Sequence, residues 1–396
     1  MVVSVRKGKT IGIVAALCGM AGAAIGIILN TMGVFYTPVA EGLGVSVGQV
    51  SLYTSISSFV GAVFSIIYPR ILTEKNYRKL MYTGMIVAIG GLIAMSAVTK
   101  LWQLYVLAPI MYMGQICFSL YIITVLLNSS IRDNVGTITG FVVGFSGITG
   151  AVCSPILTKV ISAYGWRIGY RAMAALAAVF LIPSVFAPFE FKEGTKSEGQ
   201  NKQKFNYLQK LFIVTTFVYV LAVVLTAMPQ HFVGYSQTRG FDSSTGAFML
   251  SAAMIGNILF KLIAGMLKDR FGTKTALFTV IVVAILGMFM LVFGSGKVIL
   301  LIGAFLYGSN YSANAVLFPL LARETFGAEN YKYTYPVAGF FGAVLMGFAT
   351  SGIGFIYDFT GSYIPAFFTL AGFSMINLIL ILWLMKNPGH AEQSSN

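Results

Sequence analysis

Residues 265–274 read GMLKDRFGTK, a short charged stretch that contains two glycines. An apolar run, TGAFMLSAAMIGNILFKLIA, precedes it, and a second one, TALFTVIVVAILGMFMLVF, follows it. Each run approaches the roughly 20 residues that a helix needs to cross about 30 Å of hydrocarbon. The stretch is therefore predicted to turn the chain at a membrane surface, between two transmembrane helices.

The composition of the whole chain excludes a soluble protein. Hydrophobic residues make up 57% of it and charged residues only 10%, whereas soluble domains carry about 25% charged residues. Since a bilayer offers no water to the backbone, apolar runs of this length form helices. We predict an all-α membrane protein with 12 transmembrane helices, over residues 11–37, 47–69, 80–98, 103–127, 136–160, 168–188, 208–233, 245–267, 275–294, 298–321, 334–357 and 363–385.

The positions of the Lys and Arg residues explain the formal net charge of +14. With the N-terminus placed in the cytoplasm, most of the 26 Lys and Arg fall in cytoplasmic loops and tails. This asymmetry is the positive-inside pattern of membrane proteins. It predicts a plasma-membrane protein with both termini in the cytoplasm, and it argues against nucleic acid as a partner. Lys261 lies inside a span, and the remaining six are on the opposite face: Lys100, Lys159, Arg167, Arg171, Arg239 and Lys297.

The chain repeats itself at an offset of 196 residues. Pro69 begins PRILTEKNYRK, another basic turn between apolar runs, and lies 196 residues before Gly265; Gly165 and Gly361 have the same offset. The repeat predicts two six-helix halves, as in transporters that bind substrate between parallel repeats. The predicted boundaries are 1–188 for the first half, 189–207 for a cytoplasmic linker, 208–386 for the second half and 387–396 for a cytoplasmic tail.

The stretch GMLKDRFGTK resembles the loop motif G-x-L-x-D-R-x-G-x-K of the major facilitator superfamily. The resemblance implies the major facilitator fold and alternating access between its two halves. It also implies gating roles for Gly265, Asp269, Arg270 and Gly272, with the glycines turning the chain and Asp269 capping a helix or pairing with an Arg. Arg323, at the end of the tenth span, is a further gating candidate. The first-half copy lacks the Asp-Arg pair, so gating is expected to depend more on the second half.

Four further stretches are similar to the monocarboxylate porter and oxalate/formate antiporter families: PQHFVGYSQTRGF, GTITGFVVGFSGITGAVCSP, LFPLLARETFGAEN and YDFTGSYIPAF. These families carry a carboxylate-binding Arg four residues before the first Gly of the loop motif, and Lys261 has that spacing here. Oxalate exchangers carry a second cation, at a position that aligns near Gly342. The resemblance therefore favours a monocarboxylate over a dicarboxylate. The glycines of the fifth span follow the families' pattern and are expected to let two backbones approach closely: Gly140, Gly144, Gly147 and Gly150.

Polar side chains inside the spans are the candidates for substrate binding. An ionisable residue in a span usually faces a cavity, so Lys261 is predicted to be the counter-ion of an anionic substrate; snorkelling to the surface is the alternative. On the tenth span, i, i+3, i+4 and i+7 spacing places four polar residues on one helix face, lining a cavity or bonding to another helix. The candidates besides Lys261 are Tyr36, Gln115, Tyr121, Asn257, Tyr307, Asn310, Tyr311 and Asn314, with Asn30 and Tyr112 as secondary ones.

The mode of coupling stays open at this level. All 12 acidic residues fall in loops or near span ends, so His231 is the candidate group for proton coupling, although an interfacial hydrogen bond would suit it equally. Protonation of Lys261 is a second route. Proton symport, anion exchange and uniport are all compatible with the sequence.

The composition is also compatible with functions other than transport of an anion. Efflux of amphipathic molecules is the alternative, suggested by 18 Met and 14% aromatic residues; a membrane receptor or enzyme comes third. The three cysteines lie in spans without metal-like spacing, and one of the two histidines, His390, is in the tail. We expect a monomeric transporter in the lipid bilayer, with no enzymatic activity, cofactor or metal.

Overall fold

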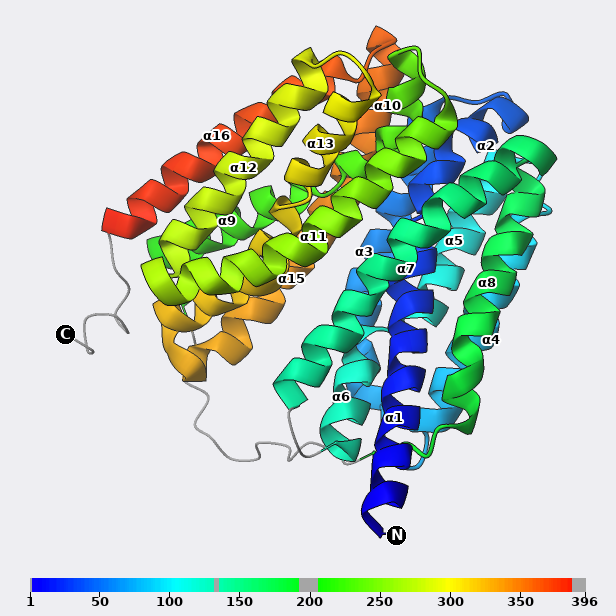
Figure 1. The fold of residues 1–396 in the computed structure, drawn as a ribbon, viewed down its shortest axis with the longest axis vertical. Coiled ribbons are helices and arrows are strands. Elements are labelled where there is room, and N and C mark those ends of the chain that lie inside the picture. Colours follow the sequence, from blue (N-terminus) through cyan, green and yellow to red (C-terminus); the bar gives the residue numbers. More distant parts are fainter. Residues whose placement is uncertain (1, 132–134, 192–205, 387–396) are drawn as a thin grey trace. The chain divides into compact units, whose positions relative to one another are not determined.

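The computed structural model describes residues 2–131, 135–191 and 206–386, and these are helical with short connections (Figure 1). Within them, 11 helices are long and apolar enough to cross a membrane, and the predicted span 298–321 is present as shorter helical pieces. The prediction of an all-α membrane protein is confirmed. Most of the predicted linker and the predicted tail lie outside the described residues.

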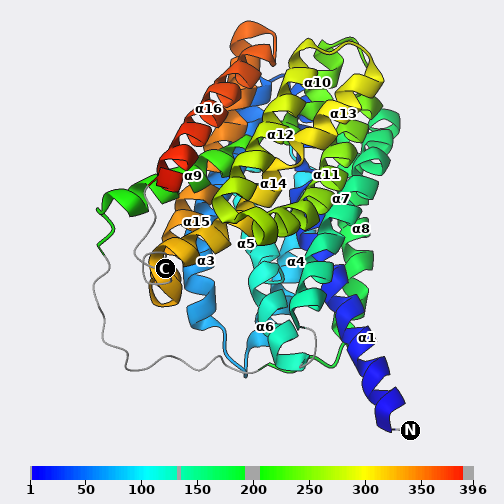
Figure 2. The ribbon, with the colours of Figure 1, turned by 60° about the vertical axis from the view of Figure 1, so that its left-hand side comes forward.

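The chain divides into two compact units, Met1–Gln200 and Asn201–Asn396. Both views show each unit as a bundle of long helices (Figures 1 and 2). The helices of unit 1 are α1 (Val2–Ala21), η1 (Gly22–Leu29), η2 (Met32–Phe35), α2 (Tyr36–Leu43), α3 (Val47–Ile71), α4 (Tyr77–Met95), α5 (Leu101–Ile116), α6 (Leu120–Ser130), α7 (Val135–Tyr164) and α8 (Trp166–Phe186). Those of unit 2 are α9 (Lys210–Leu225), η3 (Met228–His231), α10 (Phe232–Thr238), α11 (Ser243–Phe271), α12 (Thr273–Phe293), α13 (Lys297–Tyr307), α14 (Asn310–Ser312), η4 (Ala313–Leu317), α15 (Phe318–Thr360) and α16 (Ile364–Lys386).

The first and fourth spans of each unit are discontinuous. The first span turns π-helical in η1 and breaks at Asn30, and the seventh breaks after α9 at Thr226, 196 residues later. The fourth span breaks between α5 and α6, and the tenth between α13 and α14. The breaks thus follow the repeat read from the sequence. Each break frees backbone groups that need new partners, because hydrocarbon offers none.

The loop motif is more helical than expected. α11 continues to Phe271 and α12 begins at Thr273, so Gly272 alone makes the turn, with φ = 84°. The prediction of a glycine turn is confirmed for Gly272 and wrong for Gly265, which lies inside α11. Because the other nine residues of the stretch are helical, the two helices are longer than the apolar runs from which they were predicted.

At its opposite end, α11 is capped by Asp242. The Asp242 carboxylate accepts a hydrogen bond from Thr245 N at 3.0 Å, and a second from the Thr245 hydroxyl. These hydrogen bonds lower the pKa of the Asp242 carboxyl below its ordinary value. Both satisfy donors at a helix N-terminus, where the helix itself supplies no acceptors.

Close backbone contact joins η1 to α7. A Cβ at Gly26 would lie 2.6 Å from the Ser146 carbonyl oxygen and 2.9 Å from Thr149 Cβ. At Gly150 a Cβ would lie 3.2 Å from Gly26 O, which confirms the expected approach. The expectation is wrong for two other glycines of the fifth span, since nothing lies within 4 Å of a Cβ at Gly140 or Gly144.

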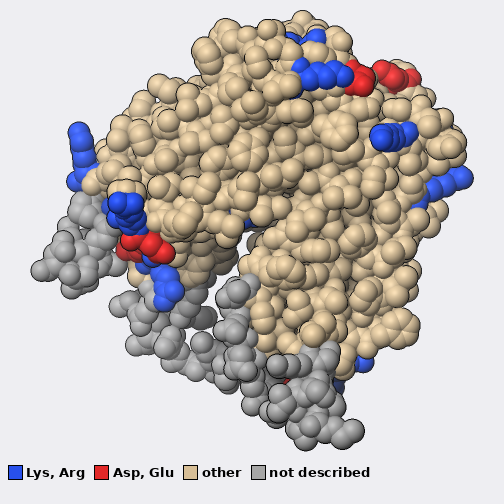
Figure 3. Space-filling view, viewed as in Figure 1, with Lys and Arg blue, Asp and Glu red and all other residues tan. Residues whose placement is uncertain are grey.

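Arginines satisfy backbone carbonyls at helix C-termini. In unit 2, the Arg239 guanidinium donates to Leu291 O at 2.9 Å and Gly294 O at 2.6 Å, at the end of α12. In unit 1, Arg167 donates to Val98 O at 3.1 Å, just beyond α4. On the face drawn in Figure 3, the described charged side chains gather near helix ends and leave an uncharged surface between, as expected for membrane helices.

The first residues of the predicted linker pack against unit 1. The Phe191 ring stacks on Tyr77 at 4.9 Å between centroids, and the Tyr77 hydroxyl donates to Phe189 O at 3.0 Å. Ser130 Oγ accepts from Glu190 N at 3.1 Å. These contacts hold residues 189–191 against the ends of α4 and α6.

The contact at Gly26 yields a stability prediction. We expect Gly26→Ala to lower the free energy of unfolding by about 1–3 kcal/mol, because the added methyl group overpacks the η1–α7 contact. Gly12→Ala on α1 is the matched control, since a Cβ there meets nothing within 4 Å, and we expect it to raise stability by up to about 1 kcal/mol. Thermal unfolding of both variants in detergent measures the difference. Equal effects at the two sites would contradict the packing argument.

Candidate functional site

Lys261 lies on the inward face of α11. It is half-buried, and it follows Asn257, which is 7% exposed, by one helical turn. The next residue, Leu262, points away from the bundle with 65% of its surface exposed. Within the described part of the chain, Lys261 makes no ion pair or hydrogen bond. A lysine inside an apolar helix thus has no protein counter-ion among these residues.

Contacts between α11 and the tenth span set the depth of Lys261. A Cβ at Gly308 would lie 3.0 Å from Asn257 N, which brings the break of the tenth span against α11. The two spans run in the same direction, because α12 connects them as an antiparallel neighbour. Lys261 lies four residues beyond Asn257, at about the depth of Asn310 and Asn314.

Asn310 and Asn314 satisfy a backbone carbonyl freed by the break of the seventh span. In a continuing α-helix, Thr226 N would donate to Ala222 O. Here Thr226 N donates to Val223 O instead, at 2.9 Å. Asn310 Nδ2 donates to Ala222 O at 2.8 Å, and Asn314 Nδ2 donates to the same oxygen at 3.3 Å. Two side-chain donors therefore share one carbonyl acceptor.

The two tyrosines of the same helix face bond to the next free carbonyls. The Tyr307 hydroxyl donates to Leu225 O at 2.6 Å, and the Tyr311 hydroxyl lies 3.5 Å from Thr226 O. All four polar residues of this face thus point at the end of α9. Of the two roles that the sequence left open for them, hydrogen bonding between helices is the one these contacts show.

Buried amide oxygens at this level have no partner among the described residues. They are Oδ1 of Asn257, Asn310 and Asn314. A buried acceptor without a hydrogen bond costs about 1–3 kcal/mol, so these oxygens favour a bound water or a ligand that donates. Together with Lys261, they form a polar patch in the core of unit 2.

In unit 1 the candidates have separate environments. Gln115 Nε2 donates to Ala24 O of η1 at 2.9 Å, a helix-to-helix bond like that of Asn310. The Tyr36 hydroxyl lies 2.8 Å from Thr54 Oγ1, and its side chain is 1% exposed. Tyr121 is 44% exposed and packs edge-on against Tyr68. Gln115 and Tyr36 therefore support the broken first span, while Tyr121 presents its ring to the surface of unit 1.

His231 lies in η3, directly after the break of the seventh span. Its Nε2 is 2.8 Å from Thr350 O of α15, and its ring centroid is 5.6 Å from that of Tyr363. Since a carbonyl only accepts, Nε2 carries the hydrogen in this contact. The side chain is 2% exposed, so the backbone of α15 holds the ring in place.

Three gating candidates, Asp269, Arg270 and Gly272, lie at the turn between α11 and α12, whereas Gly265 lies inside α11 and Arg323 in α15. Asp269 pairs with Lys268 at 3.2 Å and is largely exposed, and within the described chain it meets neither an Arg nor a helix N-terminus. Arg270 lies over the Phe271 ring, and Arg323 is exposed. Their gating role stays a prediction.

Two residues that hold the turns, Thr273 and Asn76, are not among those predicted from the sequence. Thr273 Oγ1 donates to Glu324 Oε1 at 2.7 Å, which ties the start of α12 to α15. In the first-half copy, Asn76 Oδ1 accepts from Thr73 N at 2.8 Å, and Asn76 Nδ2 donates to Ile71 O at 2.7 Å. An Asn within the basic turn is the signal that could have indicated Asn76. As for metals, no group of three or more His, Cys, Asp or Glu within the described residues could hold an ion.

The chain is similar in sequence to one protein family and to individual transporters. The sequence pattern of the Major Facilitator Superfamily matches residues 11–350. The chain is 22% identical over 365 residues to monocarboxylate transporter 13 of Rattus norvegicus, covering 87% of this chain and 82% of that one. It is 24% identical over 372 residues to the probable nitrate transporter NarT of Staphylococcus epidermidis, covering 88% and 90%.

Solved structures show the same fold. A mutant of the nucleoside transporter NupG superimposes with a TM-score of 0.77 at 15% identity, covering 94% of this chain and 98% of that chain. NupG itself gives a TM-score of 0.70 at 16% identity. At these identities the likeness concerns the fold alone.

The shared carbonyl predicts non-additive mutations. We expect Asn310→Leu and Asn314→Leu each to lower the free energy of unfolding by about 1 kcal/mol, since the other amide still satisfies Ala222 O. The double variant leaves that oxygen buried without a partner, and should cost about 1–3 kcal/mol beyond the sum of the two. A double-mutant cycle measured by thermal unfolding tests this, and strictly additive losses would contradict it.

Proposed function

Because this chain belongs to the major facilitator superfamily, we propose that it transports a small organic anion, a monocarboxylate, across the cell membrane by alternating access. Membership of the family makes the chain a multi-pass membrane transporter. The substrate class, the coupling and the residues named below are our proposal.

Lys261 is the observation that carries the proposal. Burying a cation inside an apolar span costs free energy, so such a residue generally lines a substrate pathway or pairs with an anion. Lys261 has no counter-ion among the described residues, so a substrate carboxylate can supply the missing charge. Within unit 2, the residues proposed to complete the site are Asn257, Asn310, Tyr311 and Asn314. Tyr36, Gln115, Tyr121 and Tyr307 are proposed as further substrate contacts.

A substrate with a single negative charge suits the proposed site at Lys261. The two curated relatives are named for monocarboxylate and nitrate, both monovalent anions. Position 342 is a glycine, so it supplies no second cation. A Lys or Arg side chain would also lack space there, because a Cβ at Gly342 would lie 2.6 Å from Cε1 of Tyr219. Both observations support a monocarboxylate over a dicarboxylate.

Coupling and gating complete the proposal. Transport runs as proton symport or as exchange of anions, with His231 as the proton-binding group. The turn at Gly272, with Asp269 and Arg270 beside it, Gly265 within α11 and Arg323 on α15, controls the gate. The protein works as a monomer in the plasma membrane, with both termini in the cytoplasm.

Replacing Lys261 tests the substrate class. We expect Lys261→Gln to abolish uptake of labelled acetate or lactate into proteoliposomes and Lys261→Arg to retain part of it, because a buried charge that loses its partner costs about 3–5 kcal/mol. Lys268→Gln is the matched control on the same helix, since the pair that Lys268 forms with Asp269 is exposed, and such pairs contribute about 0–1 kcal/mol.

The same assay separates the alternatives. Near-normal anion uptake by Lys261→Gln would overturn the role of Lys261. If wild-type vesicles carry none of acetate, lactate, oxalate and nitrate, yet export an amphipathic dye, the anion proposal fails and efflux takes its place.

Replacing His231 tests the coupling. In His231→Gln the side-chain amide can still donate to Thr350 O, but it cannot take up a proton at neutral pH. We expect uptake driven by a pH gradient to fall by about fivefold or more, while counterflow of labelled against unlabelled substrate persists. Both are measured on the same vesicles. A parallel loss of both would make His231 a structural or binding residue, and no change in either would place the coupling elsewhere.

A further inference from the structure

Three basic side chains gather where α4 ends and where α5 and α8 begin, at the end of unit 1 away from the N-terminus (Figure 1). Arg171 Nε donates to Ser96 Oγ at 3.2 Å, and Arg167 Nη2 donates to Val98 O at 3.1 Å. Lys100 follows Val98 by two residues and directly precedes α5. Since Arg167, Arg171 and Lys100 are all exposed, they form a basic cluster at one end of the α4–α8 pair.

No carboxylate balances this basic cluster among the residues that the structure describes. At this end of unit 1 the sequence has one acidic residue, Glu41 on α2, and it forms no ion pair in the described chain. Arg171 bonds only through Nε and Arg167 only through Nη2, so both guanidinium groups keep N–H donors that no described residue uses. Like charges that lie close together repel one another, and a bound anion would relieve this repulsion.

Basic residues beside the helix ends of unit 2 are already satisfied by the protein. Arg239 donates to the Tyr235 hydroxyl at 2.6 Å and to Gly294 O at 2.6 Å. Lys297, which begins α13, pairs with Asp242 at 3.7 Å. Cations with unused donors are therefore a particular property of the basic cluster, and not of every Lys or Arg at a helix end.

Apolar side chains continue from the basic cluster along α8. Ala175, Ala178 and Ile182 follow Arg171 at helical spacing and lie on its face. Ala175 is exposed and Ile182 is 53% exposed. On α4, which packs beside α8, Ile93 is 51% exposed and lies one turn before Ser96. An acyl chain that passes Arg171 thus contacts apolar carbon along the membrane span.

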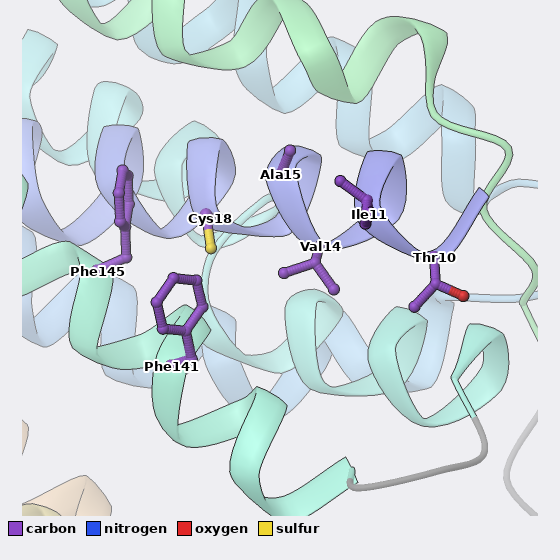
Figure 4. A pocket seen from close by; sticks show the side chains of 7 residues that line it. All are labelled: Thr10, Ile11, Val14, Ala15, Cys18, Phe141 and Phe145. Carbon is purple, nitrogen blue, oxygen red and sulfur yellow. The ribbon is translucent and has the colours of Figure 1, made fainter. Parts of the chain in front are cut away.

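An apolar surface alone does not select one lipid over another. The groove between α1 and α7, of about 430 Å³, is lined by seven residues, none of which is charged (Figure 4). No side chain in that lining distinguishes one headgroup from another. The α4–α8 surface differs, because cations with unused donors lie at its end.

We propose that the basic cluster binds the phosphate of an anionic phospholipid, whose acyl chain lies along α8 below Arg171. The lipid belongs to the leaflet opposite the N-terminus, and the site is separate from the transported substrate. An Arg guanidinium suits phosphate, since two parallel N–H groups can donate to two of its oxygens. Lys100 adds a point charge, and clusters of Lys and Arg at a membrane surface attract anionic lipids. A free phosphate ion would use the same donors but would leave the apolar row of α8 unused.

Photolabelling of the full-length protein in nanodiscs tests the site. The probe is phosphatidylglycerol with a diazirine near the glycerol end of one acyl chain, and phosphatidylcholine with the same chain is the comparison. We expect phosphatidylglycerol to label peptides 93–102 and 166–182 more strongly than phosphatidylcholine does. Replacing Arg171 and Lys100 by Gln should lower labelling by phosphatidylglycerol by about fivefold per residue, and should leave labelling by phosphatidylcholine unchanged.

Lys297→Gln provides the matched control, because Lys297 is an exposed lysine at the start of a span that already has a carboxylate partner. We expect it to leave the labelling of both peptides unchanged. Equal labelling of the wild-type protein by the two lipids would overturn the proposal, and this comparison does not depend on how any variant folds. Unchanged labelling after replacement of Arg171 and Lys100 would overturn it as well. Displacement of the lipid by millimolar inorganic phosphate would make the cluster a site for a free anion instead.

Discussion

Satisfying the backbone inside hydrocarbon is the constraint on which this structure depends. An unbroken helix meets it alone, but four spans of this chain are interrupted, at corresponding places in the two units. In unit 2, the freed Ala222 O accepts from side chains of a neighbouring span, Asn310 and Asn314. In unit 1, Gln115 donates to Ala24 O inside the π-helical segment that precedes the break. The two asparagines of the tenth span are therefore needed by the break after α9, and a substrate can bond only to the groups that these hydrogen bonds leave unused.

The sequence predicted the fold well because length and hydropathy determine it. Twelve apolar runs and the offset between Gly165 and Gly361 predicted the helices and the repeat. Hydropathy could not show the breaks, since residues such as Thr226 and Gly308 interrupt a helix without interrupting an apolar run. It also misjudged the loop motif, because charged residues at a helix end remain helical well past the apolar stretch. Gly140 and Gly144 show that glycine spacing alone does not establish a backbone contact.

The site could be predicted only in part, for a related reason. Lys261 could be selected from the sequence, because a single charged residue inside an apolar run is rare and usually has a function. The amides were found too, but their partners were not, since Asn310 and Ala222 lie 88 residues apart and nothing local links them. A local pattern identifies polar side chains within a span, whereas the direction in which each one points depends on where the neighbouring helix breaks.

The single-residue turn at Gly272 has a mechanical consequence. With no flexible loop between them, α11 and α12 form a stiff hairpin, and the Thr273–Glu324 bond fastens this hairpin to α15. Ten residues separate Lys261 from Phe271, which makes a rigid arm of about 15 Å. A tilt of only a few degrees at the level of Lys261 is thus magnified into a displacement of ångström scale at the membrane surface.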